Sequence, residues 1–133
     1  MLKVVLDTNV IVSALNFAGN PAKVFDLALE GEIDNITSEP IITEVRKILI
    51  RKFSWQPAEA EDAGTLLGFF SKIVNPNRRL QVVSHEPDNR ILECAVAGKA
   101  DFIISADHHL TDLKNYQGIK IINATTFLDL IAK

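Results

Sequence analysis

The sequence predicts an α/β fold with three layers, in which helices cover both faces of a central, mainly parallel sheet of about five strands. Strand-like and helix-like segments alternate along the 133 residues, and strands that are separated by helices usually pair in parallel. Two strand segments, Val4–Leu6 and Phe102–Ile104, are apolar at every position, as is typical of central strands buried on both faces. We expect residues 1–133 to form one domain with its own core.

The first half of the chain is expected to hold two strands and four helices. In order, these are a strand over Lys3–Leu6, helices over Val10–Leu15 and Ala22–Leu29, a strand over Asp34–Thr37, and helices over Ser38–Lys52 and Pro57–Val74. Gly19 and Pro21 separate the first two helices, and Gly31 closes the second. Ser38 is a suitable N-cap residue, with Pro40 in the first turn that follows it.

The second half is expected to alternate more regularly. In order, the elements are a strand over Leu80–Ser84, a helix over Pro87–Gly98, a strand over Asp101–Ser105, a helical turn over His108–Leu113, a strand over Lys120–Asn123 and a helix over Thr125–Ile131. In parallel sheets, functional sites lie beyond the carboxyl ends of the strands. Asp7 comes directly after the first strand and therefore occupies such a position.

Composition excludes several classes of protein. With 47% hydrophobic residues the chain is not of the disordered type, and no apolar run approaches the roughly 18 residues that a membrane span needs. The N-terminus has no signal-peptide features, and Cys94 is the only cysteine, so we expect a cytoplasmic protein without a membrane partner. The net charge of −3 argues only weakly against a nucleic-acid partner, because basic residues can cluster locally.

Most of the 17 acidic residues look like ordinary surface residues, but four do not. They are Asp7, Glu44, Asp88 and Asp107. Two of them follow central strands, and two point inward from helices. Taken singly, each has a structural interpretation. Asp7 could cap a helix, Glu44 could lie at the edge of an apolar helix face, Asp88 could interact with a helix dipole, and Asp107 could be a polar turn residue.

Taken together, the four carboxylates would converge at one edge of the sheet and repel one another. No Lys or Arg shares their helical stripes. A divalent cation with oxygen ligands would stabilise them, and Mg²⁺ or Mn²⁺, as one or two ions, suits carboxylates and water. Such a centre activates water for attack on a phosphodiester. Cys94 lies on an apolar helix face and is expected to be a core residue rather than a nucleophile.

These residues carry a family resemblance. The segments VVLDTNVIVSAL, EPIITEVRKIL, EPDNRILECAVAGKADFIISADHHL and KIINATTFLDLI occur in this order over nearly the whole chain. Together they resemble the PIN-domain family, and in particular the toxin (VapC-like) components of prokaryotic toxin–antitoxin modules. The resemblance implies a Mg²⁺- or Mn²⁺-dependent endoribonuclease with an RNA substrate and a cognate antitoxin protein.

The resemblance also implies roles for individual residues. The acidic site of the family corresponds to Asp7, Glu44, Asp88 and Asp107. Asn9 matches a polar residue that orients the first acid, and Ser105 would act in the same way near Asp107. Ala106 departs from the Gly found in many relatives. His109 stands where some relatives have an acid, and is either a surface residue or one that positions RNA or metal.

Basic and apolar surfaces are the candidates for binding RNA and protein. Arg46, Arg51 and Lys52 lie on the helix that carries Glu44 and would contact RNA phosphates, unless they only form a solvated face. The helix ending in LLGFFSKIV is more apolar than an exposed helix requires. It predicts a homodimer surface or an antitoxin groove, with core packing as the alternative.

Two other functions compete with the ribonuclease. An aspartate-nucleophile phosphatase also has an acid after its first strand, but it needs a second Asp at the position that Asn9 occupies here. A degenerate PIN scaffold would bind RNA or protein without cleaving it. The presence of all four acids argues against that alternative.

Overall fold

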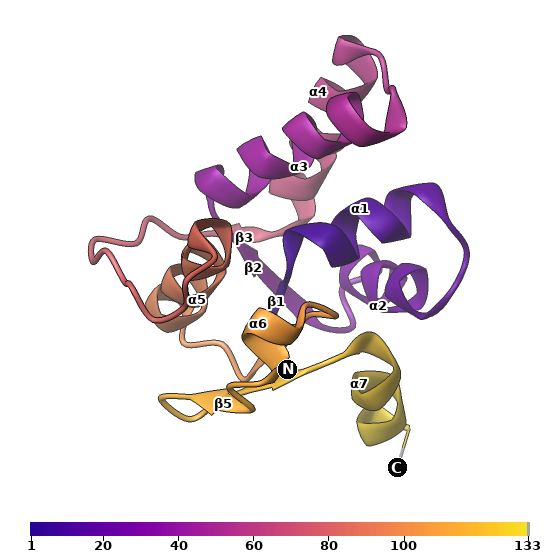
Figure 1. Ribbon diagram of the computed structural model, residues 1–133. Coiled ribbons are helices and arrows are strands. Elements are labelled where there is room, and N and C mark those ends of the chain that lie inside the picture. Colours follow the sequence, from indigo (N-terminus) through magenta and orange to yellow (C-terminus); the bar gives the residue numbers. More distant parts are fainter. Residues whose placement is uncertain (133) are drawn as a thin grey trace.

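The computed structural model describes residues 1–132 and contains a six-stranded sheet with helices on both sides (Figure 1). The strands are β1 (Lys3–Leu6), β2 (Asp34–Thr37), β3 (Lys72–Ile73), β4 (Phe102–Ile104), β5 (Asn115–Tyr116) and β6 (Ile119–Ile122). Their order in the sheet is β3-β2-β1-β4-β6-β5, and every neighbouring pair is parallel except β5 and β6. The predicted α/β fold with a mainly parallel central sheet is confirmed.

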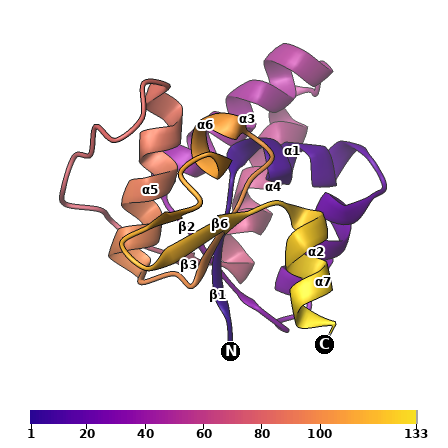
Figure 2. The ribbon, with the colours of Figure 1, turned by 60° about the horizontal axis from the view of Figure 1, so that its bottom comes forward.

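The helices are α1 (Thr8–Asn16), α2 (Asn20–Leu29), α3 (Glu39–Phe53), α4 (Pro57–Phe70), α5 (Glu86–Gly98), α6 (His108–Thr111) and α7 (Ala124–Ile131). Helix α5 packs on β1, β2 and β4, whereas α1, α2 and α7 lie together on the other side of the sheet (Figure 2). Helices α3 and α4 pair with each other, and α3 also contacts α1 and α5. None of the helices within the described residues combines the length and apolarity needed to cross a bilayer.

The two continuous apolar strands form the centre of the core, as predicted. Val4, Val5, Ile103 and Ile104 are fully buried, and Phe127 of α7 closes the core with no exposed surface. Strand β1 lies in the middle of the sheet, with α5 over one face and α1 and α2 over the other (Figure 2), so none of its last three residues faces solvent.

The chain reverses direction across the sheet at β1, and this reversal positions the site. From β1 the chain passes through α1 and α2 to β2, and it later returns through α5 to β4 on the opposite side of β1. Leu6 is in register with Ile104, so Asp7 and Ser105 are the residues that follow two neighbouring strands. Ligands of open α/β sheets bind at such a switch point.

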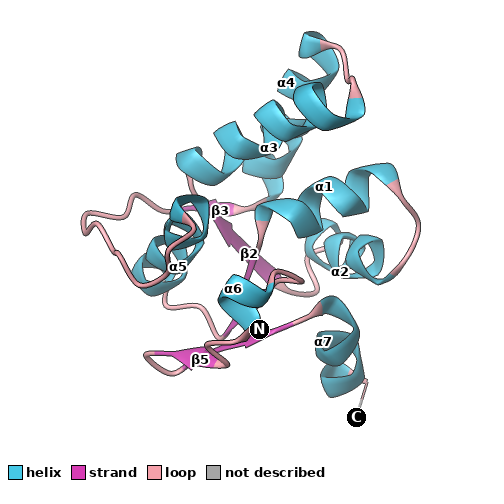
Figure 3. Cartoon of the chain, viewed as in Figure 1, coloured by secondary structure: helices cyan, strands magenta, loops and turns pink. Residues whose placement is uncertain are grey.

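The predicted strand over Leu80–Ser84 is wrong. These residues belong to the long loop between β3 and α5 (Figure 3). Side chains of α5 satisfy the backbone there: Glu93 Oε2 accepts from the Leu80 N–H at 2.8 Å. Asn89 Oδ1 accepts from the N–H groups of Val82 and Val83 at 2.9 and 3.0 Å. The apolar residues of this segment therefore do not need a neighbouring strand.

The third strand lies earlier, where the sequence predicted the end of a helix. Helix α4 stops at Phe70 rather than near Val74, and Lys72–Ile73 pairs with Ile36–Thr37 of β2. A further short strand, β5, forms a hairpin with β6 and was not predicted. Its two-residue turn places Gln117 and Gly118 at φ values of +49° and +82°, the left-handed geometry that such tight hairpins require.

Candidate functional site

The first predicted acid, Asp7, lies at the switch point and faces β4. Its N–H continues the β1–β4 ladder by donating to Ile104 O at 2.9 Å. Its side chain does not cap α1, although Asp7 is the residue before that helix. Instead, the Ser105 hydroxyl donates to Asp7 Oδ2 at 2.7 Å, and the Asp7 side chain is almost fully buried.

Asp107 is the N-cap residue of α6 and lies two residues after Ser105. Its backbone N–H donates to Ser105 Oγ at 3.0 Å, so one hydroxyl connects Asp7 and Asp107. Asp107 Oδ1 accepts from the backbone N–H of His109 and also lies 2.9 Å from His109 Nδ1. Ser105 therefore contacts both acids, and its role in orienting them stays a prediction.

Asp88 enters the same region from the first turn of α5. The residue is 4% exposed, and its Oδ2 lies 3.0 Å from Nδ1 of His85, the residue that precedes the helix. The carboxyl groups of Asp88 and Asp107 are close enough to share a hydrogen bond. Three of the four predicted acids are thus brought together from three different elements.

Burial and mutual repulsion change the acidity of this cluster. Burial, together with the nearby carboxylates of Asp88 and Asp107, raises the pKa of Asp7 from 3.8 to about 6, against the opposing effect of the Ser105 hydrogen bond. Burial also raises the pKa of Asp88, helped by the charge of Asp107. For Asp107, burial is outweighed by hydrogen bonds from His109, and its pKa is lowered.

Glu44 approaches this cluster from α3 without joining it as closely. It is half-buried and lines a small cavity of about 60 Å³ with Thr8 and Pro87, the residues next to Asp7 and Asp88. Among the described residues, His85, Asp88, Asp107 and His109 form a group that could hold a metal ion, because one ligand atom from each lies within 4.8 Å of the others. Glu44 is not part of that group.

The donor set fits a divalent cation. The carboxylates of Asp88 and Asp107 lie close enough to Asp7 to affect its pKa, and the side chains of other described residues that hydrogen-bond to these three carboxylates belong to Ser105, His85 and His109 rather than to a Lys or Arg. Such a set suits Mg²⁺ or Mn²⁺, which bind through one or more carboxylates and water. When bound, an ion would also reduce the repulsion that raises the pKa of Asp7.

The remaining predicted residues have varied surroundings. Asn9 is exposed on α1. Arg46 pairs with Glu61 of α4 at 3.1 Å and lies against Gly64, so its side chain joins the two helices. Arg51 and Lys52 are exposed in the last turn of α3. That turn lies about 10 Å along the helix from Glu44, as the rise of 1.5 Å per residue requires.

A broad groove of about 540 Å³ lies between α3 and the start of α5, and Glu44 is one of its lining residues. It is lined by Glu39, Pro40, Thr43, Glu44, Lys47, Arg79, Glu86, Pro87 and Arg90. Lys47 and Arg79 supply positive charge beside Glu44, whereas Arg90 is paired with Glu93 at 2.8 Å.

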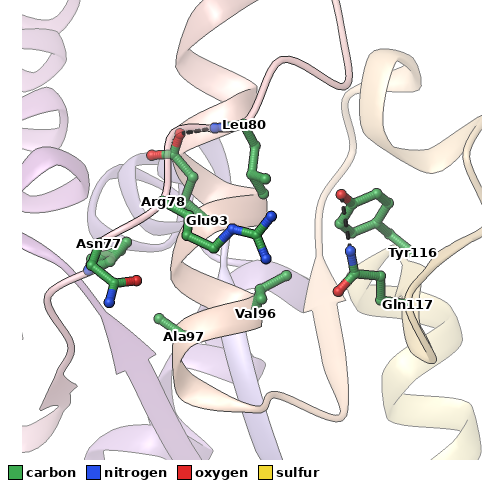
Figure 4. A pocket seen from close by; sticks show the side chains of 9 residues that line it. Asn77, Arg78, Leu80, Glu93, Val96, Ala97, Tyr116 and Gln117 are labelled. Atoms are coloured by element: carbon green, nitrogen blue, oxygen red, sulfur yellow. Dashed lines mark hydrogen bonds between the residues drawn. The ribbon is translucent and has the colours of Figure 1, made fainter.

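A smaller pocket of about 130 Å³ lies elsewhere, between the 76–80 loop, α5 and β5 (Figure 4). Tyr116 and Gln117 face Val96 and Ala97 across it, and Glu93 is bonded to Leu80 at its rim. Within residues 1–132, none of the four predicted acids lines this pocket. It is therefore separate from the acidic site.

Sequence reasoning missed His85, because a single histidine before a helix gives no periodic signal. The one signal in the sequence is the spacing of three residues between His85 and Asp88, which allows the two side chains to pair. The apolar end of α4 is partly explained by the core: Leu67 is buried. Phe69 and Leu66 are 88% and 40% exposed, and the expected homodimer or antitoxin surface stays a prediction.

Comparison with known proteins agrees with this fold. A family model described as "PIN domain" matches residues 3–109. The chain belongs to the PIN-domain family. It is 38% identical over 119 residues to the uncharacterized protein MJ1680 of Methanocaldococcus jannaschii, covering 86% of this chain and 76% of the relative.

A solved structure shows the same fold. A chain of the VapBC2 complex of Rickettsia felis, bound to a DNA fragment from their promoter, superposes with a TM-score of 0.64. The match covers 92% of this chain and 98% of that chain at 14% identity. The expected PIN-domain family is confirmed, and the match to the VapBC2 structure shows a shared fold.

Proposed function

We propose that this protein is a metal-dependent endoribonuclease that hydrolyses RNA phosphodiester bonds and serves as the toxin of a toxin–antitoxin module. The observation that carries the proposal is the convergence of Asp7, Asp88 and Asp107 at the switch point of the sheet. Membership of the PIN-domain family supports it, because PIN domains are in general metal-dependent nucleases.

In this proposal Asp7, Glu44, Asp88 and Asp107 hold one or two Mg²⁺ or Mn²⁺ ions. Bound divalent ions polarise a phosphoryl oxygen and lower the pKa of a coordinated water. Ser105 keeps the Asp7 carboxylate in one orientation and fixes the backbone of Asp107 at the same time. Burial of Asp7 excludes bulk water from the carboxylates that face the reacting phosphate.

RNA would reach the acids along the groove that Glu44 lines. In this proposal Lys47 and Arg79, which also line the groove, contact phosphates on either side of the cleaved bond. Arg51 and Lys52 extend the basic surface along α3, whereas Arg46 contributes less because Glu61 already neutralises it. In this proposal Asn9, exposed at the start of α1 two residues after Asp7, orients the Asp7 carboxylate.

The partner proteins follow from the same assignment. The structural neighbour from Rickettsia felis is part of a VapBC2 complex, which supports a cognate antitoxin for this chain. We assign the exposed Leu66 and Phe69 of α4 to a protein contact, with either the antitoxin or a second copy in a homodimer. A ribonuclease that acts on cellular RNA would work in the cytoplasm.

Cleavage of labelled RNA by the purified protein tests the proposal. We expect cleavage with Mn²⁺ or Mg²⁺, none with chelator, and a loss of at least about 100-fold in Asp7→Asn and Asp88→Asn. Asp62→Asn, which changes an exposed acid of α4, is the matched control and should cleave normally.

Three other outcomes would contradict the proposal. Cleavage that persists in chelator and in Asp7→Asn would exclude these acids and their ions. RNA binding without cleavage at any metal concentration would indicate a degenerate PIN scaffold. A phosphoryl group attached to Asp7 would identify an aspartate-nucleophile phosphatase.

A further inference from the structure

Two histidines stand beside the acids of the site, one from each of two helix starts. His85 precedes α5 and its Nδ1 lies 3.0 Å from Asp88 Oδ2; His109 lies in α6 and its Nδ1 is 2.9 Å from Asp107 Oδ1. The two imidazole rings stack on each other with centroids 5.6 Å apart and planes 20° apart. The site is therefore edged by nitrogen donors as well as oxygen donors.

The distances permit one ion to contact all four side chains. One ligand atom from each of His85, Asp88, Asp107 and His109 lies within 4.8 Å of the others. Metal–ligand bonds of roughly 2.0–2.2 Å place donors on one ion up to about 4.4 Å apart, so small side-chain movements would complete the set. The His85 and His109 side chains are 51% and 41% exposed, which leaves the site open to an entering ion.

Nitrogen donors distinguish between divalent ions. Mg²⁺ binds oxygen ligands and releases its water reluctantly, so imidazole adds little to its affinity. Mn²⁺, and more strongly Co²⁺, accept imidazole together with carboxylate. A site with two histidines therefore gains affinity for transition-metal ions without an equal gain for Mg²⁺.

We propose that His85 and His109 are nitrogen ligands that make the acidic site selective for a transition-metal dication such as Mn²⁺ over Mg²⁺. The inference rests on the proposed function, in that it takes Asp88 and Asp107 to be metal ligands. It adds that the metal preference of this chain is set by the two helix-start histidines.

Metal affinity measured by isothermal titration calorimetry tests this assignment on the full chain. In the double variant His85→Ala/His109→Ala we expect the affinity for Mn²⁺ to fall by about 10–100-fold, and that for Mg²⁺ to change by less than about threefold. His108→Ala is the matched control, because His108 is an exposed neighbour of His109 outside the donor group. Its Mn²⁺ affinity should not change.

Absorption spectra of Co²⁺ give a readout that does not depend on activity. The visible bands of Co²⁺ bound to the wild-type protein should shift in the double variant and remain in His108→Ala. Equal Mn²⁺ affinities and identical Co²⁺ spectra in the wild type and the double variant would overturn the inference. If the double variant loses its circular dichroism signal, the two single variants replace it, and each should weaken Mn²⁺ binding more than Mg²⁺ binding.

RNA cleavage by the same proteins separates this inference from the proposed function. A double variant that cleaves RNA in Mg²⁺, with wild-type affinity for Mn²⁺, would refute the histidine ligands and leave the ribonuclease intact. A wild-type protein that binds Mn²⁺ through the histidines but never cleaves RNA would refute the ribonuclease alone.

Discussion

Ser105 donates a hydrogen bond of 2.7 Å to Asp7, although 98 residues separate the two in the chain. The same hydroxyl accepts the backbone N–H of Asp107 at 3.0 Å. Because Ser105 is fully buried, water does not replace either bond when it is broken. One small side chain thus sets the relative position of two carboxylates.

Removing this hydroxyl should weaken both the fold and the metal site. In Ser105→Ala, the buried N–H of Asp107 loses its acceptor, and we expect the free energy of unfolding to fall by about 1–3 kcal/mol. The orientation of Asp7 is lost as well, so the affinity for Mn²⁺ should fall by about 10–100-fold. Urea unfolding and calorimetry measure these effects, and Ser84→Ala, at an exposed position, is the control. Unchanged Mn²⁺ affinity would show that Ser105 does not position the acids.

The pKa of Asp7 predicts how stability depends on pH in the absence of metal. The pKa is about 6 in the folded protein and 3.8 ordinarily, because burial and the neighbouring carboxylates disfavour the charged form. The folded state therefore binds more protons between these values. The stabilisation that protonated Asp7 gives the folded state is complete below pH 3.8, and it is lost as the pH rises through 6.

Asp7→Asn removes this dependence and should stabilise the metal-free protein at pH 8. We expect a gain on the order of 1–3 kcal/mol in the free energy of unfolding at pH 8 and a much smaller change at pH 4. Urea unfolding in chelator at both pH values measures the difference, with Asp62→Asn as the exposed control. A variant less stable than the wild type at pH 8 would contradict the raised pKa.

Asn89 should be required for the loop that leads into α5. Its fully buried amide accepts from the N–H groups of Val82 and Val83 and donates to Val83 O and Glu86 Oε1. Asn89→Ala leaves these groups unpaired, and we expect a loss of about 2–4 kcal/mol in the free energy of unfolding.

Hydrogen exchange locates the effect of this substitution. The amides of Val82 and Val83 should exchange faster in Asn89→Ala, because their acceptor is gone. Asn75→Ala, at an exposed position in the same loop, should leave both rates unchanged. Protection of these amides that survives in Asn89→Ala would mean that another acceptor holds the loop.

Gly98 should not tolerate a side chain. A Cβ there would lie 2.6 Å from Cγ2 of Ile36, which is buried in β2. Gly98→Ala should therefore lower the free energy of unfolding by about 1–3 kcal/mol. In an Ile36→Ala background the same substitution should have an effect below about 0.5 kcal/mol, since the clash is gone.

Gly68 provides the contrast within another helix. The nearest atom to a Cβ at this position is Ile73 Cδ1 at 3.5 Å, an ordinary contact. Gly68→Ala should stabilise the protein by up to about 1 kcal/mol, because alanine favours helix more than glycine. Thermal unfolding of Gly68→Ala and Gly98→Ala measures both changes in stability. Equal changes would exclude the contact with Ile36 as the cause of the loss expected in Gly98→Ala.

The central sheet could be predicted from sequence because its signal is local. Val4–Leu6 and Phe102–Ile104 are short apolar runs, and burial on both faces is the usual reason for such runs. The position of Asp7 beyond β1 follows from parallel topology alone. Which acids meet was harder to predict, since Asp88 and Glu44 project from helices whose tilt the sequence does not determine, and Glu44 stays outside the cluster.

The errors arise where side chains replace backbone pairing. The apolar segment Leu80–Ser84 has the pattern of a strand, but Asn89 and Glu93 satisfy its N–H groups. The pair Arg46–Glu61 joins two helices, and no spacing rule predicts which residues of separate helices will meet. His85 joins the site through a loop, where periodicity carries no information.

The order of the strands in the sheet also has a consequence for synthesis on the ribosome. Asp7 directly follows the first strand to emerge, but Ser105, which follows β4, emerges 98 residues later. A nascent chain therefore cannot assemble the acid cluster until α5, β4 and the start of α6 have been made. Under the proposed function, the ribosome carries an inactive nuclease until that stage of synthesis.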